Sequence, residues 1–193
     1  MSSDKLRSMM FKLVLIGDAS VGKTSIRRRY MGSGFVAQHL ATIGVDFAQK
    51  YVKVNDNTIR LVIWDLAGQE AYEKIRSYYY QGCSAVILVY SVVDRRSFDN
   101  ASKWLVEAHK YIGSLPPSVV VGNKIDLREQ KSRHDIVTTD EGKKFASVFS
   151  DRMNIPVLFK ETSALTGENI EDAFCDLTNL MIEVYKERKE KLK

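Results

Sequence analysis

The sequence contains little cysteine and proline and no long apolar run. Two of its 193 residues are cysteine and three are proline, which excludes a disulfide-stabilised secreted scaffold and a proline-rich linker. No apolar stretch approaches the roughly 18 residues that a membrane-spanning helix needs, and residues 1–8 are polar, unlike a secretory signal. We therefore expect a cytoplasmic protein in which Cys83 and Cys175, both in apolar contexts, are buried reduced thiols.

Charge of one sign is not concentrated either. The formal net charge is +5, and no basic stripe is interleaved with aromatic residues, so we expect no nucleic-acid binding. The length fits one domain with a sizeable core. We expect a flexible N-terminus over 1–8, one folded domain over 9–185 and a charged tail over 186–193.

An apolar run at 11–16 leads into the loop Gly-Asp-Ala-Ser-Val-Gly-Lys-Thr at 17–24, and a helical pattern follows. The spacing G-x-x-x-x-G-K-[ST] is typical of a phosphate-binding P-loop. Its glycines let backbone N–H groups approach a phosphate closely, Lys23 can reach the β- and γ-phosphates, and the Thr24 hydroxyl can bind Mg²⁺. The alternative is an ordinary glycine-containing turn, but the strand–loop–helix context favours nucleotide binding.

Strand-like and helical patterns alternate along the chain. Apolar runs predict strands at 11–16, 44–54, 58–65, 85–90, 118–122 and 156–159. Helical periodicity predicts helices at 22–31, 71–80, 95–112, 139–150 and 170–184, with Asp94 capping the third. The hairpin at 44–65 supplies one antiparallel strand. We therefore predict an α/β fold of the P-loop NTPase type: a six-stranded, mostly parallel sheet with about five helices on both faces.

Two polar motifs follow predicted strands, where ligands collect in such sheets. Asp65 can hold Mg²⁺ through a water, and it is followed by Gly68, whose N–H can approach a γ-phosphate, and by Gln69, which can orient an attacking water. In the second motif, 123–126 (Asn-Lys-Ile-Asp), Asp126 can accept both N1–H and the N2 amino group of guanine, which adenine cannot offer. Taken singly, each motif is also compatible with an ordinary polar turn.

Together these residues resemble the Ras superfamily of small GTPases, and the Rab family within it most closely. The resemblance runs from about residue 9 to 184 and includes 17–24, Thr42, 65–70, 123–126 and Ser163-Ala164 in family order. It implies GTP or GDP and Mg²⁺ as cofactors. The residues that it assigns to the nucleotide are Ala19, Ser20, Val21, Gly22, Lys23, Thr24, Ser25, Phe35, Thr42, Gly68, Asn123, Lys124, Asp126, Ser163, Ala164 and Leu165. Those that it assigns to Mg²⁺ are Thr24, Thr42 and Asp65, and those that it assigns to catalysis are Gln69, Lys23, Thr42 and Gly68.

The resemblance also supplies roles that the residues alone do not. It implies that Phe35 packs against the guanine edge, that Lys124 lies over its face, and that Thr42 engages Mg²⁺ and the γ-phosphate. Without it, Phe35 would be a core aromatic and Thr42 a loop threonine. It further implies switch segments at 33–47 and 66–80 that bind effectors, GTPase-activating proteins and nucleotide-exchange proteins, and we expect a monomer.

A group of three aromatic residues, Phe47, Trp64 and Tyr79, resembles the surface triad that Rab partners contact. Packing between the hairpin and the following helix is an equally good explanation from sequence alone.

Three features depart from the family pattern. Leu66 replaces the threonine that usually follows the Mg²⁺-binding aspartate, which would stiffen or misplace the second switch segment. His39 stands where relatives usually place an aromatic residue over the phosphates. The tail at 186–193 has no cysteine for prenylation, so membrane contact is open and depends on whether the native C-terminus is longer.

The main hypothesis is a Rab-like switch that hydrolyses GTP to GDP and phosphate and regulates membrane traffic or signalling through its partners. The alternative is a GTP-binding interaction module with negligible hydrolysis. An ATP-dependent enzyme such as a kinase conflicts with Asp126.

Overall fold

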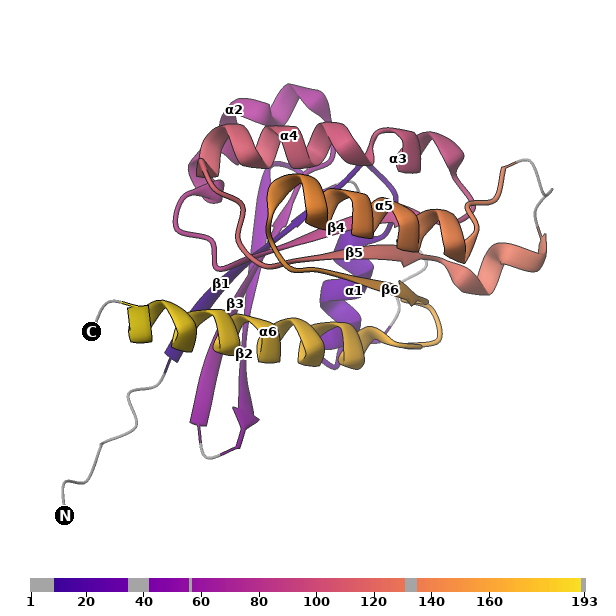
Figure 1. The fold of residues 1–193 in the computed structure, drawn as a ribbon. Coiled ribbons are helices and arrows are strands. Elements are labelled where there is room, and N and C mark those ends of the chain that lie inside the picture. The colour runs from indigo at the N-terminus through magenta and orange to yellow at the C-terminus, as the bar shows by residue number, and fades with distance from the viewer. Residues whose placement is uncertain (1–8, 35–41, 56, 131–134, 192–193) are drawn as a thin grey trace, which may run out of the picture.

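The computed structural model describes residues 9–34, 42–55, 57–130 and 135–191 (Figure 1). Within these ranges one sheet contains β1 (Met9–Ile16), β2 (Val45–Val54), β3 (Asn57–Leu66), β4 (Ala85–Ser91), β5 (Ser118–Asn123) and β6 (Val157–Thr162). The strand order is β2-β3-β1-β4-β5-β6. All neighbours are parallel except β2 and β3, which form the antiparallel hairpin. The predicted fold class is confirmed.

The helices of the described residues cover both faces of the sheet. They are α1 (Lys23–Tyr30), α2 (Glu73–Tyr80), α3 (Arg95–Asp99), α4 (Ala101–Ile112), α5 (Thr139–Met153) and α6 (Ile170–Lys191), with short 3₁₀ helices η1 (Glu70–Tyr72) and η2 (Ile125–Gln130). Figure 1 shows α2 to α5 on one face and α1 and α6 on the other. Because both faces are covered, every residue of β4 and of β5 is buried.

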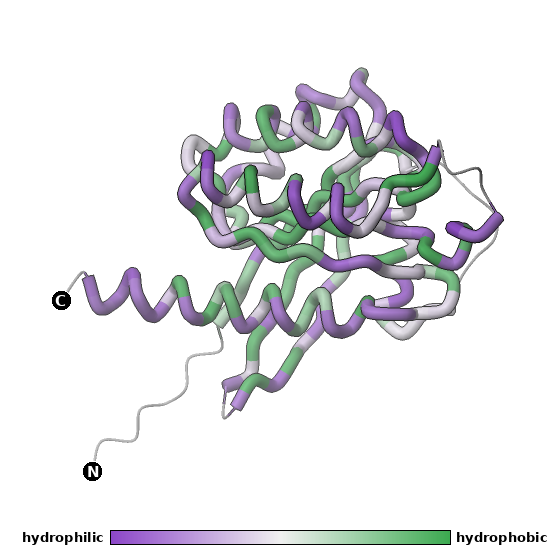
Figure 2. Tube along the Cα trace, turned by 45° about the vertical axis from the view of Figure 1, so that its right-hand side comes forward, coloured by the Kyte–Doolittle hydropathy of each residue, from purple (hydrophilic) through white to green (hydrophobic). Residues whose placement is uncertain are grey.

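The two faces carry two separate apolar cores. On the α1 and α6 side, the Tyr30 and Phe174 rings stack with their centroids 3.8 Å apart. On the other side, Tyr80 and Leu105 pack with the opposite faces of β1 and β4. Figure 2 shows the apolar residues concentrated along the strands and the inward faces of the helices. The sheet is therefore held rigidly from both sides, which fixes the positions of its strand ends.

Three details differ from the sequence predictions. The helix predicted at 95–112 is interrupted at Asn100, which separates α3 from α4 and adds a helix to the predicted five. The Asn100 side chain donates to the Asp18 carboxylate (2.8 Å) instead of facing solvent. Cys175 is exposed on α6, which makes the prediction of burial wrong there, while Cys83 is half-buried and burial raises the pKa of its thiol to about 11.

Helix α6 also continues beyond residue 184, where the predicted helix ends. Its last turns are hydrophilic and project past the sheet (Figures 1 and 2), and the expected boundary between domain and tail at 185/186 falls inside it. Within the described ranges, no helix combines the length and the apolar composition that crossing a bilayer requires.

Candidate nucleotide-binding site

The loops that follow β1, β3, β5 and β6 meet at one edge of the sheet. In a doubly wound sheet this edge lies beyond the carboxyl ends of the parallel strands, and ligands bind where the strand order reverses. Here the order reverses at β1, whose neighbours are β3 and β4. The P-loop at 17–24 follows β1 directly and therefore lies at the reversal point.

The P-loop is shaped by two glycines and one residue in a left-handed conformation. A Cβ on Gly17 would lie 2.1 Å from the Val89 carbonyl oxygen, and one on Gly22 would lie 2.3 Å from Asn123 Nδ2. Ser20 has a φ of 62°, which is uncommon for a residue with a side chain. The two glycines therefore let the loop pack closely against Val89 of β4 and Asn123 of β5.

Lys23 is buried at the start of α1 with its ammonium group inside the loop. Its Nζ donates to the carbonyl oxygens of Gly17 and Asp18, both at 2.7 Å. Burial lowers the pKa of Lys23 to about 8, against the opposing effect of Asp65 and Asp18. A phosphate beside this amine would favour its charged form. The loop therefore presents a cation and a helix N-terminus to the same space.

The side chain of Thr24 contacts those of both Thr42 and Asp65. The Thr24 hydroxyl donates to Asp65 Oδ2 at 2.5 Å and lies 2.9 Å from the Thr42 hydroxyl. Asp65 is fully buried, and its Oδ1 has no hydrogen-bond partner within the described chain. Burial raises the pKa of Asp65, while Thr24, Lys23 and Arg27 act in the opposite direction. Two hydroxyls and a carboxylate form the hard oxygen donor set that Mg²⁺ prefers, and the unpaired Oδ1 fits a water bound to it.

A cavity of about 150 Å³ lies beside the P-loop. It is lined by Gly22, Ser25, Asn123, Lys124, Asp126, Leu127, Ala164 and Leu165. The Lys124 ammonium donates to the Ser20 carbonyl oxygen at 2.6 Å, and Lys124 itself has a left-handed φ of 69°. Asp126 Oδ1 accepts from the Ser163 hydroxyl at 2.5 Å, so the loop after β6 holds the carboxylate in place.

Asn123, at the end of β5, connects the three loops of the site. Its Nδ2 donates to the Val21 carbonyl oxygen at 2.9 Å. Its Oδ1 accepts from the Thr162 hydroxyl at 3.1 Å and from the Ala164 backbone N–H at 3.2 Å. Asn123 is only 1% exposed and lines the cavity, so it supports the cavity wall from within the fold.

The segment after β3 approaches the P-loop from the other side. A Cβ on Gly68 would lie 2.5 Å from the Ala19 backbone nitrogen, so Gly68 packs directly on the loop. Gln69 precedes η1, and its Oε1 is buried without a partner among the residues described. Leu66 is fully buried in the core that contains Tyr80, so its side chain acts in packing.

The three aromatic residues form one continuous group. The Phe47 and Trp64 ring centroids are 5.0 Å apart, and those of Trp64 and Tyr79 are 4.8 Å apart. Phe47 is 51% exposed and the other two are half-buried. The group therefore packs between β2, β3 and α2 and also presents an aromatic surface, so the two interpretations of the sequence are compatible.

Two predicted residues fall outside the described ranges. These are Phe35, expected at the guanine edge, and His39, which stands where relatives place an aromatic residue over the phosphates and for which a looser cover or simple exposure to solvent is expected.

Four residues that organise the site were missed by the sequence reasoning. Asp18 accepts from Trp104 Nε1 at 2.6 Å and so joins the P-loop to α4. Arg29 Nε donates to the Ala164 carbonyl oxygen at 3.1 Å and so joins α1 to the loop after β6. Arg76, 1% exposed, donates to the Ala67 and Gln69 carbonyl oxygens.

The fourth is Arg27, which is buried on α1 and pairs with Asp46 on β2. It lies one helical turn after Lys23 and therefore on the same face of the helix. That spacing is the signal that could have revealed it.

The fold and this arrangement of loops are those of a P-loop NTPase. A model of the Ras family matches residues 12–183, and the chain belongs to this family. Among curated proteins, Ras-related protein RABD2c of Arabidopsis thaliana is 41% identical over 169 residues, which are 88% of this chain and 79% of that protein. GTP-binding protein YPT1 of Saccharomyces cerevisiae is 41% identical over 165 residues, 86% of this chain and 75% of that protein.

A third relative is GTP-binding protein YPTM2 of Zea mays, 42% identical over 165 residues, 86% of this chain and 76% of that protein. The resemblance to the Ras superfamily, and to Rab proteins within it, is confirmed.

Proposed function

We propose that this protein is a Rab-like guanine-nucleotide switch that hydrolyses GTP to GDP and phosphate. The observation that carries the proposal is the cavity in which the Asp126 carboxylate, fixed by Ser163, lies next to the P-loop. A carboxylate at that place accepts the paired donors of guanine and repels the acceptor edge of adenine. Two of the relatives are named as GTP-binding proteins, which supports the same ligand.

Hydrolysis requires charge neutralisation and an oriented water. Lys23 and the P-loop N–H groups would stabilise negative charge on the transferring phosphoryl group. Mg²⁺, held by Thr24 and Thr42 with Asp65 behind a water, would supply further neutralisation when bound. Gln69, beside the P-loop through Gly68, would direct a water in line with the bond between the γ-phosphorus and the bridging oxygen.

The chain carries no arginine in the segment 33–42. We therefore infer slow intrinsic hydrolysis, of order 10⁻⁴ s⁻¹, which an arginine from an activating partner would accelerate by roughly 10³–10⁵.

The same geometry supports a switch. The Ala67 backbone N–H donates to the Gly44 carbonyl oxygen at 2.9 Å, so the two segments that would sense the γ-phosphate are bonded to one another. Release of the phosphate would loosen both 33–47 and 66–80. Effectors, activating proteins and exchange proteins would bind the surface of Phe47, Trp64 and Tyr79 with an affinity that depends on this change. We infer that the protein acts as a monomer in the cytoplasm, where its two free cysteines remain reduced.

The proposal is tested by competition for a fluorescent GDP analogue and by single-turnover hydrolysis. We expect GTP and GDP to displace the analogue and ATP to fail at a hundredfold excess over GDP. Radiolabelled GTP should then be converted to GDP in the presence of Mg²⁺ and not after chelation. Displacement by ATP as effective as by GTP would refute guanine specificity. Tight GTP binding with no turnover would instead establish the alternative, a GTP-binding interaction module.

A further inference from the structure

Arg27 lies between two carboxylates on neighbouring strands. It extends from α1 and is only 7% exposed. Its Nη2 pairs with Asp46 Oδ2, and its Nε lies 3.9 Å from Asp65 Oδ2. Asp46 and Asp65 are register partners in the β2–β3 hairpin. The guanidinium therefore contacts both Asp46, near the end of the first switch segment (33–47), and the carboxylate assigned to Mg²⁺.

The two contacts are unequal. The Asp46 contact is a charge-assisted hydrogen bond, whereas 3.9 Å to Asp65 is an ion pair without one. Arg27 Nε is buried and has no hydrogen-bond partner in the described part of the chain. The side chain of Asp46 is 54% exposed, while that of Asp65 is fully buried. Arg27 is thus held by the half-exposed Asp46, while its Nε faces the buried Asp65 carboxylate without a hydrogen bond to it.

A second cation at Asp65 would meet this positive charge. A unit positive charge beside a buried carboxylate lowers the affinity of that carboxylate for a second cation by about tenfold or more. Arg27 therefore lowers the attraction of Asp65 for Mg²⁺. The size of this effect depends on Asp46, because the pair with Asp46 holds the guanidinium away from direct pairing with Asp65.

We propose that Arg27 is a positioning residue that sets the magnesium requirement for nucleotide retention, and that Asp46 determines how strongly it acts. The inference rests on the proposed function, because it concerns the same Mg²⁺ and guanine nucleotide. Asp46 is four residues after Thr42, so movement of the first switch segment would alter the Asp46–Arg27 pair. Partner binding at this strand could then change magnesium affinity without touching the metal ligands.

The test is the release rate of a fluorescent GDP analogue from the full chain, measured against free Mg²⁺ concentration. The readout is the Mg²⁺ concentration that half-suppresses release. We expect Arg27→Met to lower this midpoint by about tenfold, because it removes the competing charge. Asp46→Asn should raise it, because Arg27 is freed to pair with Asp65. The double variant should behave like Arg27→Met, since Asp46 acts only through Arg27.

Two controls separate charge from structure. Arg28→Met removes the same charge one residue along α1, where no ion pair links the residue to any part of the chain that the structure describes, and it should leave the midpoint unchanged. Arg27→Lys retains the charge and should stay within about threefold of the parent chain. Met has nearly the length of Arg. The Asp46 side chain is 54% exposed and can be hydrated once Arg27 is removed, and Asp65 keeps its hydrogen bond from Thr24, so the variant should fold.

An Arg27→Met midpoint equal to or higher than that of the parent chain would overturn the inference alone. Failure of the parent chain to bind GDP, or release that ignores Mg²⁺, would overturn the proposed function and this inference with it.

Discussion

Replacing Asn123 by alanine is expected to destabilise the protein even without nucleotide. The side chain makes three hydrogen bonds in a buried environment, to the Val21 carbonyl oxygen, the Thr162 hydroxyl and the Ala164 backbone N–H. Each buried hydrogen bond contributes about 1 kcal/mol net, and partners left unsatisfied cost more. The expected loss is therefore about 3 kcal/mol in the free energy of unfolding.

The assay is urea unfolding of nucleotide-stripped protein, followed by far-ultraviolet circular dichroism. In a thermal scan of the same protein, a loss of about 3 kcal/mol would appear as a fall of roughly 6–12 °C in the midpoint for a chain of this size. Asn179→Ala on α6 is the matched control, because Asn179 is exposed and its Nδ2 makes one weak contact with Cys175 Sγ, at 3.8 Å. It should change the free energy by less than about 0.5 kcal/mol.

An Asn123→Ala protein as stable as the control would refute the reasoning. It would mean that water or a local shift satisfies all three partners, and that Asn123 serves the nucleotide alone. A drop seen only with nucleotide present would lead to the same conclusion, since ligand binding adds to apparent stability by mass action.

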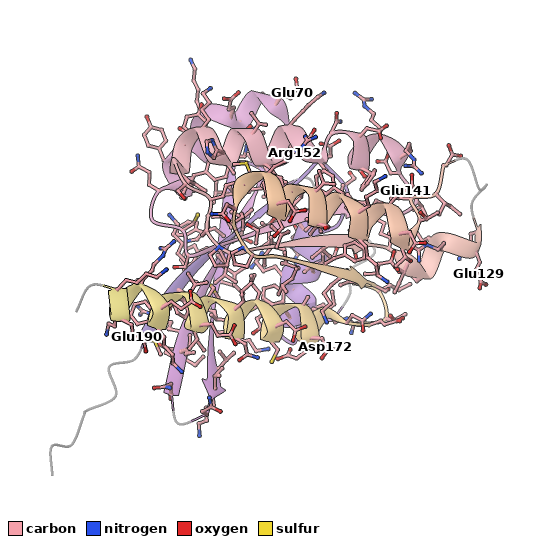
Figure 3. All side chains as sticks on the ribbon, in the orientation of Figure 1. Glu70, Glu129, Glu141, Arg152, Asp172 and Glu190 are labelled. Atoms are coloured by element: carbon pink, nitrogen blue, oxygen red, sulfur yellow. The ribbon has the colours of Figure 1, made fainter. Side chains whose placement is uncertain are left out.

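Three further results are expected. In a fluorescence titration, Asp126→Asn should weaken GDP binding by about 10²–10⁴, because two charge-assisted hydrogen bonds are lost, and should improve xanthosine diphosphate binding. The control Glu129→Gln, at the outer end of η2 in Figure 3, should change neither affinity. Gln69→Leu should slow single-turnover GTP hydrolysis at least about tenfold with little change in GDP affinity. Hydrogen bonding from Arg95 lowers the pKa of Glu141 from 4.5 to about 2, so the stability that this pair contributes above pH 4.5 should be lost as the pH falls towards 2. In Glu141→Gln the urea midpoint should depend less on pH over that range.

Much of the fold followed from local sequence. The wholly apolar runs that became β4 and β5 indicated strands covered on both faces, and the hairpin followed from its turn residues. The P-loop was predictable because a strand, two glycines and a lysine at fixed spacing leave few other structures. The interruption of the helix at Asn100 was not predictable from the local helical period. Asn100 makes a hydrogen bond to Asp18, which is 82 residues away in sequence.

The tertiary role of the arginines was the main omission. In sequence, residues 27–29 look like a solvated basic stretch on a short helix. In the structure Arg27 and Arg29 each bond to a segment far away in the chain, Arg27 to β2 and Arg29 to the loop after β6. Such contacts depend on which strands the topology places beside α1, and composition does not report that. Cys175 was misjudged for the related reason that its apolar neighbours face away from it, towards the sheet.

One short helix, α1, therefore connects the proposed metal site with the loop after β6 that lines the cavity. Helix α1 carries Thr24 at the proposed metal site, Arg27, which pairs with the hairpin, and Arg29, which contacts the loop after β6. Eight residues of hydrogen-bonded helix are stiff, so the backbone positions that carry these three side chains move together. A displacement of β2 transmitted through Arg27 would consequently reach both Thr24, three residues before it, and Arg29, two residues after it, within one helical turn. This linkage gives a physical route by which a partner bound at the hairpin could alter both magnesium and base binding, and the Asp46→Asn and Arg27→Met variants act directly on it.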